Sequence, residues 1–405
     1  MAATDYSFRV KDAVIGAQML LVAFGSLVLV PLLTGLSSNV ALFTAGIGTL
    51  IFQVITRGKV PIFLASSFAF IAPICFGIKT WGLPATMGGL IMVGVVYMVV
   101  SLLVYLRGVN FILKIFPPIV TGSVIMVIGL ILVPTGVNMA TGGDTIPKGT
   151  ALVISMSALA TTCVVSLFGK GLLRLLPVIC GIIVGWIVAF FMGVGDFSPI
   201  AAAPWLAMPD FTAPVFSAAP ILFFIPVALA PAIEHFGDIM AISSVTGKNY
   251  LEDPGIHRTI LGDGIATMAA CLFAGPPNTT YSEVTGAVAL TRSFNPGVMT
   301  WAAIAAILLS FVAKLGAVLS CIPTPVMGGI MILLFGTITV VGLNTLVQAH
   351  LDLMAPRNLI IVTLTLIFGI SGISFGVGDF QLNGIGLAAI VGVILNILLP
   401  EKKKV

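Results

Sequence analysis

The chain has 405 residues, of which 59% are hydrophobic and only 8% are charged, and its formal net charge is +4. Soluble domains carry about 25% charged residues, so this composition excludes a water-soluble fold and indicates a protein that crosses a membrane several times. The apolar runs are long and unbroken, which excludes an outer-membrane barrel, whose strands alternate in segments of about ten residues. The small net charge does not imply binding to nucleic acid.

Taken in chain order, the apolar runs predict an all-α polytopic membrane protein with fourteen membrane-spanning segments, at about 20 residues for each helical span. The polar N-terminal stretch is followed by an apolar run too long for a signal-peptide core, so the first segment is expected to stay in the protein. The expected segments are 13–34, 40–56, 60–78, 82–106, 117–134, 151–168, 175–195, 216–242, 259–275, 280–293, 298–321, 324–347, 358–374 and 381–399.

The lysines and arginines predict the orientation. If the N-terminus is cytoplasmic, all but three of the 18 basic residues fall on the cytoplasmic side, the exceptions being Lys79, Lys148 and Lys314. Cytoplasmic loops attract Lys and Arg, and the chain ends in a polar basic stretch at 401–405. We therefore expect a multi-pass protein of the cytoplasmic (inner) membrane with both termini in the cytoplasm.

A long-period repeat relates the two halves of the chain. The spacing P-x-x-x-G at 118–122, in the fifth segment, recurs at 325–329, in the twelfth. Seven segments separate the two copies, and an odd number per repeat makes the second half enter the membrane from the opposite side, as in many secondary transporters. We expect one inverted repeat over residues 1–212 and the other over residues 213–405.

The third and tenth segments are interrupted in both halves of this repeat. Pro61 and Pro73 flank a serine pair in the third, and Pro276-Pro277 precede a run of Asn, Thr and Ser in the tenth. Non-helical backbone at membrane depth is tolerated only where it lines a cavity or is buried in protein. Broken segments at matching positions indicate a transport site, and we expect each to hold an extended piece followed by a half-helix.

Two of the four glutamates, Glu234 and Glu283, lie inside apolar segments. An ionisable group at bilayer depth costs about 2.5–3.5 kcal/mol on insertion scales, so the first interpretation is functional. Asp238 follows Glu234 by one helical turn and faces the same side; it is either a proton-relay partner or a solvated residue near the cytoplasmic end. His235 and Asp263 are expected to be structural.

Other motifs carry less weight. Gly372 to Gly376 fits the G-x-S-x-G pattern of hydrolases, but it ends a membrane segment without a preceding strand, and the 44 glycines make chance matches common. Gly181 to Gly185 fits G-x-x-x-G, which leaves a homodimer possible without identifying its face. No His, Cys, Asp and Glu residues have metal-ligand spacing, and no cofactor or enzymatic activity is indicated.

Three stretches resemble the nucleobase–ascorbate transporter family, and most closely its bacterial uracil-permease branch. The resemblance runs from about Val14 to Leu399 and is most specific in the stretches 59–70, 232–237 and 277–292. It implies fourteen segments with a core domain from about 13–106 and 216–321, and a gate domain from about 117–195 and 324–399. The substrate would sit between short antiparallel strands in the third and tenth segments.

The same resemblance implies the roles of individual residues. Glu234 and Glu283 would hydrogen-bond a nucleobase, the backbones at Phe68 and Ser282 would add contacts, and Tyr281 would line the site. A glutamate at position 283, where purine-transporting relatives tend to carry glutamine, favours a pyrimidine. The expected function is proton-coupled symport of a nucleobase, most simply uracil, with Glu234, Glu283 and Asp238 as the proton-coupling groups.

Three positions depart from the family pattern: Met19 where histidine is common, Asp238 where the uracil permeases carry histidine, and Val284 where asparagine is usual. They leave open which nucleobase is carried and whether the proton passes position 238. A purine, xanthine or urate symporter of the same family is the nearest alternative. An anion exchanger or channel of the same architecture is the alternative of another class. It would require a fixed positive charge or open half-helix dipoles at the midplane, and no pair of acids there.

Overall fold

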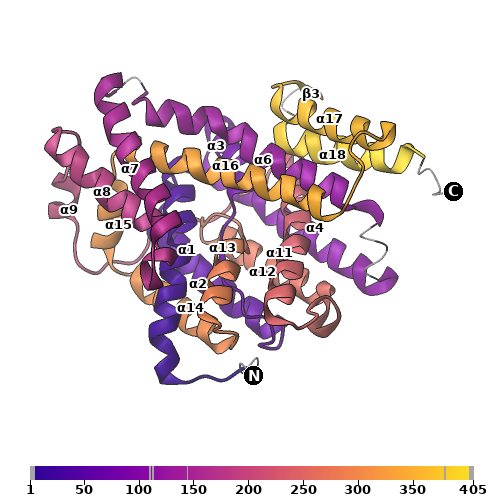
Figure 1. Ribbon diagram of the computed structural model, residues 1–405, viewed down its shortest axis with the longest axis horizontal. Helices are drawn as coiled ribbons and strands as arrows, with labels where there is room; N and C mark the ends of the chain where they lie inside the picture. Colours follow the sequence, from indigo (N-terminus) through magenta and orange to yellow (C-terminus); the bar gives the residue numbers. More distant parts are fainter. Residues whose placement is uncertain (1–4, 109–110, 112–113, 144, 378–379, 401–405) are drawn as a thin grey trace.

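The computed structural model describes residues 5–108, 111, 114–143, 145–377 and 380–400, and the predicted basic stop at 401–405 lies outside them. Within this range the chain is mostly helical, and the helices divide into two groups that pack mainly within themselves (Figure 1). Each group combines helices from the first and second halves of the sequence. The chain order therefore interleaves the two groups.

Most of the first helix group, including α1, α2, α12 and α14, lies in the lower part of Figure 1, and α3 lies higher, near α16 in this view. Its central packing joins helices that are far apart in sequence, with α4 against α12 and α2 against both α12 and α14. Its helices are α1 (Ala13–Thr34), α2 (Ser38–Ile55), α3 (Ile71–Trp81), α4 (Leu83–Arg107), α10 (Ala218–Val227), α11 (Leu229–Thr246), α12 (Ile256–Leu272), α13 (Ser282–Thr291), α14 (Gly297–Ser310) and α15 (Ala313–Ser320).

The second helix group is centred on α6 and α16, which pack along each other's length. Its helices are α6 (Pro118–Ala140), α7 (Lys148–Phe168), α8 (Pro177–Phe191), α16 (Thr324–Gln348), α17 (Pro356–Ile370) and α18 (Gly384–Leu398). Short helical turns complete the assigned helices of the described chain: η1 (Val10–Asp12), η2 (Phe68–Phe70), η3 (Gly171–Leu175), α9 (Ser198–Ala202) and η4 (Leu251–Gly255).

The packing contacts recur in matched pairs. The contact of α4 with α12 is matched by that of α14 with α2, and the contact of α1 with α14 by that of α10 with α4. In the second group, α7 packs on α8 as α17 packs on α18, and α16 packs on α7 as α6 packs on α17. In each matched pair of contacts, both helices of one contact lie seven predicted segments away from the corresponding helices of the other contact. This is the arrangement that two related halves produce.

Glycines permit the closest helix crossings between the halves. A Cβ atom on Gly94 of α4 would lie 2.4 Å from the carbonyl oxygen of Gly264 in α12, and one on Gly122 of α6 would lie 2.8 Å from the oxygen of Gly342 in α16. Both distances are shorter than a carbon atom can occupy without moving the backbone. Gly122 is the glycine of the repeated P-x-x-x-G spacing, so the repeat motif marks a packing contact.

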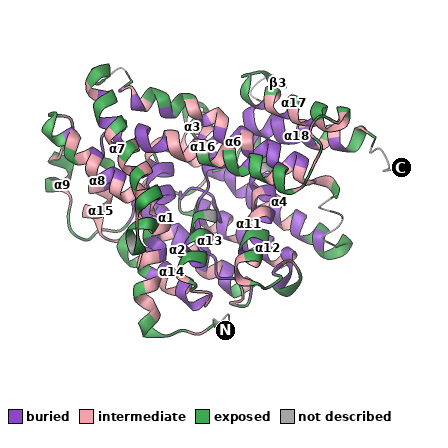
Figure 2. Ribbon diagram, in the orientation of Figure 1, coloured by how far each residue is buried: buried purple, intermediate pink, exposed green. Residues whose placement is uncertain are grey.

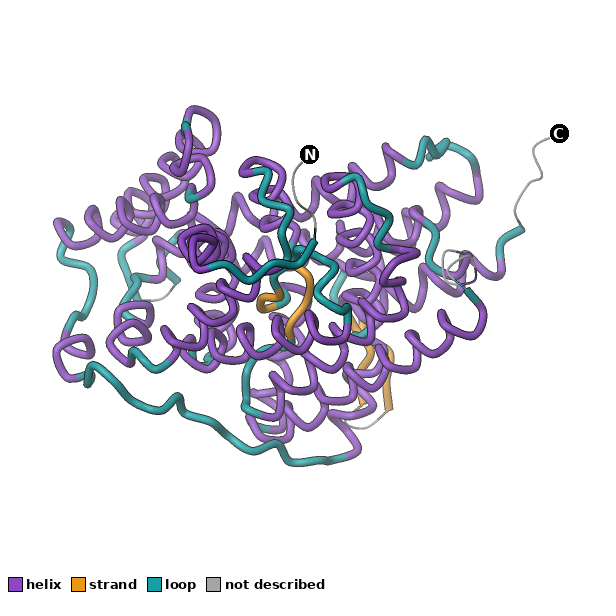
Figure 3. Tube along the Cα trace, turned by 90° about the horizontal axis from the view of Figure 1, so that it is seen from below, coloured by secondary structure: helices purple, strands orange, loops and turns teal. Residues whose placement is uncertain are grey.

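The third and tenth segments contain short strands, as predicted. β1 (Leu64–Ser66) and β2 (Asn278–Thr280) pair in antiparallel register, with Leu64 opposite Thr280 and Ser66 opposite Asn278. Figure 3 shows this pair among the helices, apart from a second pair near the edge. After β1 the chain turns through η2 into α3, and after β2 it enters α13 at Ser282. In both segments a half-helix therefore follows an extended piece, as the sequence predicted.

One predicted continuous segment is broken. The eighth is continuous, because Ala228 keeps helical backbone angles between α10 and α11, and α11 runs on to Thr246. The eleventh is interrupted at Phe311, because the segment that connects the halves forms backbone hydrogen bonds there. The Ala207 N–H donates to the Phe311 oxygen over 3.1 Å, and the Ala313 N–H donates to the Trp205 oxygen over 3.1 Å.

A hairpin at the end of the chain was not predicted. β3 (Ser374–Val377) pairs with β4 (Phe380–Asn383), where the hydropathy predicted the close of the thirteenth segment and the start of the fourteenth. The predicted segments 358–374 and 381–399 left most of the stretch 374–383 as a connection, and its mixed polar and apolar residues have no clear strand periodicity. Helix α18 begins directly after the hairpin at Gly384.

The surface of the molecule is apolar, as a bilayer requires. Within the described residues, seven helices are long and apolar enough to cross a membrane, and five shorter helices are also apolar. Figure 2 shows buried residues concentrated toward the middle, while outer helices carry exposed ones. On α7 and α8 the exposed side chains include Leu167, Phe168, Phe190 and Phe191. Lipid chains can cover such side chains, and water cannot do so without cost.

Candidate functional site

The paired strands are held by hydrogen bonds from the helices beside them. The Leu64 N–H donates to the Thr49 hydroxyl on α2 over 3.0 Å, and the Asn278 side-chain amide donates to the Thr44 carbonyl over 2.8 Å. From the other side, the Thr267 hydroxyl on α12 donates to the Asn278 carbonyl over 2.7 Å. Backbone groups of such short strands have few partners of their own, so α2 and α12 fix where the strands lie.

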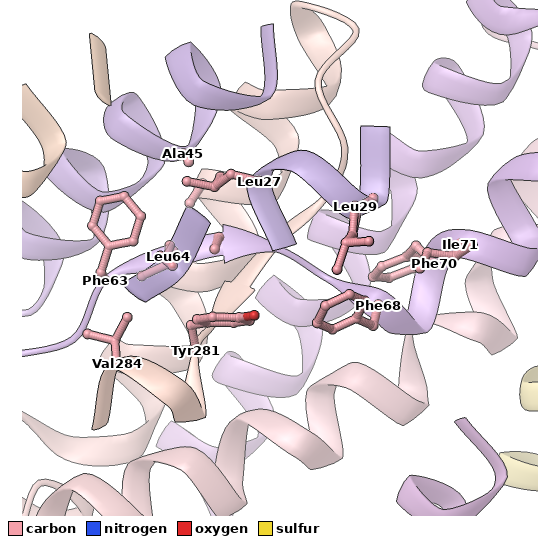
Figure 4. Close-up of a cluster of buried hydrophobic side chains, with 14 of the residues drawn as sticks. Leu27, Leu29, Ala45, Phe63, Leu64, Phe68, Phe70, Ile71, Tyr281 and Val284 are labelled. Atoms are coloured by element: carbon pink, nitrogen blue, oxygen red, sulfur yellow. The ribbon is translucent and has the colours of Figure 1, made fainter. Parts of the chain in front are cut away.

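Two aromatic rings lie where the strands end. The Ser67 N–H donates to the Pro277 oxygen over 3.0 Å and extends the strand pairing to the start of the first half-helix. Phe68 and Tyr281, which follow the two strands, have ring centroids 6.4 Å apart (Figure 4). Phe68 also meets Phe335 of α16 edge-on at 6.5 Å. The strand crossing therefore borders the second helix group.

Glu234 and Glu283 converge on this crossing from different helices. Glu234 lies half-buried on α11, and Glu283 lies in the first turn of α13, where its side chain is exposed while the next residue, Val284, is buried. The two helices pack together. The carboxyl groups are close enough to interact electrostatically with each other and with Asp238. The two acids singled out in the sequence are therefore brought together.

Asp238 is not a solvated residue. Its side chain is only 4% exposed, and it accepts a hydrogen bond of 2.7 Å from the hydroxyl of Thr280, at the end of β2. The solvated alternative is therefore wrong, and the carboxylate belongs to the interior beside Glu234. No functional role was predicted for Thr280. Thr280 is the last residue of β2, and its hydroxyl faces α11. The sequence alone does not show which helix lies beside this strand.

His235 and Asp263 meet in the same interior. His235 Nδ1 lies 3.0 Å from Asp263 Oδ2, and His235 Nε2 lies 3.0 Å from the Thr259 hydroxyl. The expectation that both residues are structural fits their complete burial. The sequence did not indicate that they would pair, because they lie on different helices and neither has a spacing motif toward the other.

The remaining predicted residues occupy the same region. The Tyr281 side chain is buried, and its hydroxyl is within hydrogen-bonding reach of Ser26 on α1. Ser282 is the first residue of α13, and the structure describes it by its backbone only. Across the described part of the chain, no group of three or more His, Cys, Asp and Glu residues could hold a metal ion.

A cavity separates part of the two helix groups. Its volume is about 270 Å³, and it lies between α3 and α10 of the first group and α6, α17 and α18 of the second. Its wall includes Phe76, Phe223, Ile131 and Asn383. The two groups are thus not packed tightly against each other over their whole boundary, in contrast to the close glycine crossings inside each group.

Comparison with known proteins gives consistent matches. A family model described as "Permease family" matches residues 10–376. A "Probable uracil permease" of Pasteurella multocida (strain Pm70) is 55% identical over 394 residues, which cover 97% of this chain and 94% of that protein. A second "Probable uracil permease", of Haemophilus influenzae (strain ATCC 51907 / DSM 11121 / KW20 / Rd), is 54% identical over 98% of this chain and 96% of its own length.

Solved structures share the architecture at much lower identity. The transmembrane domain of a cyanobacterium bicarbonate transporter, BicA, superposes with a TM-score of 0.64 at 16% identity. The superposition covers 97% of this chain and 99% of that domain. At this identity the likeness concerns the fold. It agrees with a multi-pass arrangement of two helix groups.

Proposed function

Because this chain belongs to the nucleobase–ascorbate transporter family of permeases, we propose that it carries uracil into the cell together with a proton. The names of its relatives support uracil as the substrate. The observation that carries the proposal is the convergence of Glu234 and Glu283 at the start of a half-helix beside paired strands. A flat heterocycle could be bound there by both acids.

The chemistry of the pair suits a uracil edge. Uracil alternates N–H donors with carbonyl acceptors, and a carboxylate only accepts hydrogen bonds while a carboxylic acid also donates one. Two carboxyl groups can match such an edge when one of them carries a proton. Neighbouring carboxyl groups share such a proton as a pair, so that Glu234 and Glu283 would bind the nucleobase and the proton cooperatively. Asp238, held by Thr280, is the nearest relay partner.

The helix groups supply the moving parts of this proposal. The first group corresponds to the expected core domain and the second to the expected gate domain, each assembled from both repeats, 1–212 and 213–405. The matched packing contacts support the two-repeat division. The contact of Phe68 with Phe335 supports a site at the boundary between the groups. Movement of the core against the gate would then expose the site to either side.

We propose the cytoplasmic membrane as the location, with both termini in the cytoplasm, on the distribution of Lys and Arg. A homodimer would have to use a face other than the G-x-x-x-G motif. A Cβ atom on Gly181 would lie 2.1 Å from the Thr162 hydroxyl, and one on Gly185 would lie 2.8 Å from Val326. The motif is therefore occupied by packing within the chain.

Two alternatives are distinguished by the residues of the site. An anion exchanger is suggested by the fold shared with a bicarbonate transporter, but the crossing holds carboxylates, which repel anions. A purine, xanthine or urate symporter would bind a larger edge. The glutamate at position 283, where the resemblance associates purines with glutamine, favours uracil.

Uptake into proteoliposomes tests the proposal. Purified protein should accumulate radiolabelled uracil when an inward proton gradient is imposed and should only equilibrate it when the gradient is absent. Unlabelled uracil should compete strongly, and xanthine, urate, ascorbate and bicarbonate should not. Uptake that is indifferent to the gradient contradicts symport, and competition by bicarbonate alone contradicts the substrate class. Glu283→Gln should lose uracil uptake or shift it toward purines.

A further inference from the structure

A buried polar cluster lies directly behind the two glutamates. His235 follows Glu234 on α11, and its imidazole is fully buried. Its Nδ1 lies 3.0 Å from Asp263 Oδ2 and its Nε2 lies 3.0 Å from the Thr259 hydroxyl, both on α12. The Thr280 hydroxyl lies 3.4 Å from Nδ1. One side chain therefore contacts both the helix and the strand that support the site.

The donors and acceptors determine where the protons are. The Thr259 hydroxyl has a single proton and donates it to the Ile256 carbonyl over 3.0 Å, so its oxygen accepts from His235 Nε2–H. Nδ1 lies 3.4 Å from the Thr280 hydroxyl and faces Asp263 Oδ2 at 3.0 Å without a formed hydrogen bond. With a proton on Nδ1, the imidazolium and the Asp263 carboxylate form a pair of no net charge. A buried pair of this kind avoids the cost of an isolated charge, which is several kcal/mol per ion.

The cluster is connected to Asp238 through the strand. The Thr280 hydroxyl has one proton and donates it to Asp238 Oδ2 over 2.7 Å, so that it can only accept from the imidazole. His235 and Asp238 are three residues apart on α11 and lie on neighbouring positions of one face. Thr280 at the end of β2 therefore contacts α11 through both Asp238 and His235. His235 in turn connects α11 to α12 through Asp263.

We propose that His235, paired with Asp263, is a positioning residue that fixes the rotation of α11 and so holds Glu234 and Asp238 toward the nucleobase. The inference rests on the proposed function. Glu234 lies about 100° from His235 around the helix, since an α-helix has 3.6 residues per turn. With the imidazole fixed against α12, the glutamate must point along the α13 side, where Glu283 lies. Three carboxyl groups interact electrostatically with Glu234: Asp238 on the same helix, Glu283 on α13 and Asp263 on α12.

The protonation of the pair can be measured directly. The chain has three histidines, and the double variant His257→Gln/His350→Gln leaves His235 as the single imidazole. Nitrogen NMR of this variant in lipid bilayers, without added uracil, should show a proton on Nε2, because the Thr259 hydroxyl can only accept from that nitrogen. An Nε2 without a proton would overturn the hydrogen-bond assignment. This measurement does not depend on which substrate is transported.

Binding measurements test the positioning role. His235→Phe and Asp263→Asn should each weaken uracil binding by about tenfold or more, because each leaves the other partner buried and unmatched. The double variant His235→Gln/Asp263→Asn restores an amide pair and should recover most of that loss, to within about threefold, since coupled residues are not additive. His257→Gln serves as the control and should bind like the wild type.

Two outcomes separate this inference from the proposed function. If the single variants unfold at lower temperature but their folded fraction binds uracil with unchanged affinity, His235 is structural only and the inference is wrong. If wild type and control fail to bind uracil while the NMR shows the protonated Nε2, the substrate is wrong. The binding measurements are then repeated with whichever nucleobase the wild type binds most tightly. The inference is contradicted if that binding is not weakened in the single variants and recovered in the double variant.

Discussion

The two halves of the first helix group differ in what they bury. Among the described residues of the first half, the buried polar side chains are Ser, Thr, Asn and Gln, such as Ser67 and Gln53. The buried side chains of the second half include His235, Asp238 and Asp263, and Glu234 and Glu283 lie beside them. A strand and a half-helix occur in each half, but among the described residues of this group the buried Asp and His side chains lie in the second half only.

This difference shows how a pseudo-symmetric fold supports an asymmetric site. An ionisable group at membrane depth is costly, and a small heterocycle needs only one set of such groups. The first half contributes a strand of Leu, Ala and Ser and the ring of Phe68. The second half contributes a strand of Asn, Thr and Thr, whose last hydroxyl binds Asp238. On the proposed function, the first half would support and cover the site, and the second half would carry its chemistry.

The largest expected effect concerns Glu234. Glu234→Ala should reduce uracil uptake about 100-fold, because it removes a hydrogen bond to a charged group, worth about 1.5–3 kcal/mol, together with a proton carrier. The measurement is initial uptake into proteoliposomes at matched protein density. Glu252→Ala, at an exposed position of the same half, is the control and should be unchanged. Uptake near wild type in Glu234→Ala would show that the chemistry does not depend on this half.

Sequence reasoning predicted part of this arrangement. Prolines and polar residues predicted that the third and tenth segments are broken and that each holds an extended piece followed by a half-helix, because they act locally on the backbone. Two isolated acids in apolar runs led to the prediction of a site at Glu234 and Glu283, which stays a prediction. The convergence of His235, Thr259, Asp263 and Thr280 could not be predicted, because it depends on how α11, α12 and β2 cross. For the same reason the break at Phe311 escaped notice, since its hydrogen-bond partners lie in the remote connector.

A second prediction tests the scaffold shared by the halves. Gly94→Ala would place a methyl group 2.4 Å from the Gly264 carbonyl oxygen, and overpacking of this kind costs about 1–3 kcal/mol. The melting temperature of the purified protein should fall, and uracil affinity of the folded fraction should change little. Gly336→Ala, with no heavy atom within 4 Å of the added carbon, is the matched control. An unchanged melting temperature in Gly94→Ala would contradict the tight crossing of α4 and α12.

A third prediction concerns how the second half holds the N-terminal residues of the first. The Asn295 side chain accepts from the Ser7 N–H over 2.9 Å and donates to the Ser7 carbonyl over 2.8 Å, while Trp301 stacks on Phe8 at 4.6 Å. Asn295→Ala should cost about 1–2 kcal/mol, since the hydrogen bonds of the side chain to Ser7, Asp12 and the Gly297 N–H are lost in a partly wet site. Hydrogen exchange of the Ser7 amide should accelerate, whereas Asn249→Ala, in an exposed loop, should leave it unchanged.

The smallest effect is expected at an ion pair between the halves that lies in water. Lys59 Nζ lies 2.6 Å from Asp253 Oδ2, but the two side chains are 39% and 71% exposed. Exposed pairs contribute about 0–1 kcal/mol and are screened by salt. Lys59→Ala should therefore shift the melting temperature barely, and less still in high salt, while Asp263→Asn lowers it clearly under both conditions. The contrast follows from burial, because the His235–Asp263 pair has no solvent to replace a lost partner. If Lys59→Ala destabilised the protein as much as Asp263→Asn does, burial would not explain why the His235–Asp263 pair matters more than the Lys59–Asp253 pair.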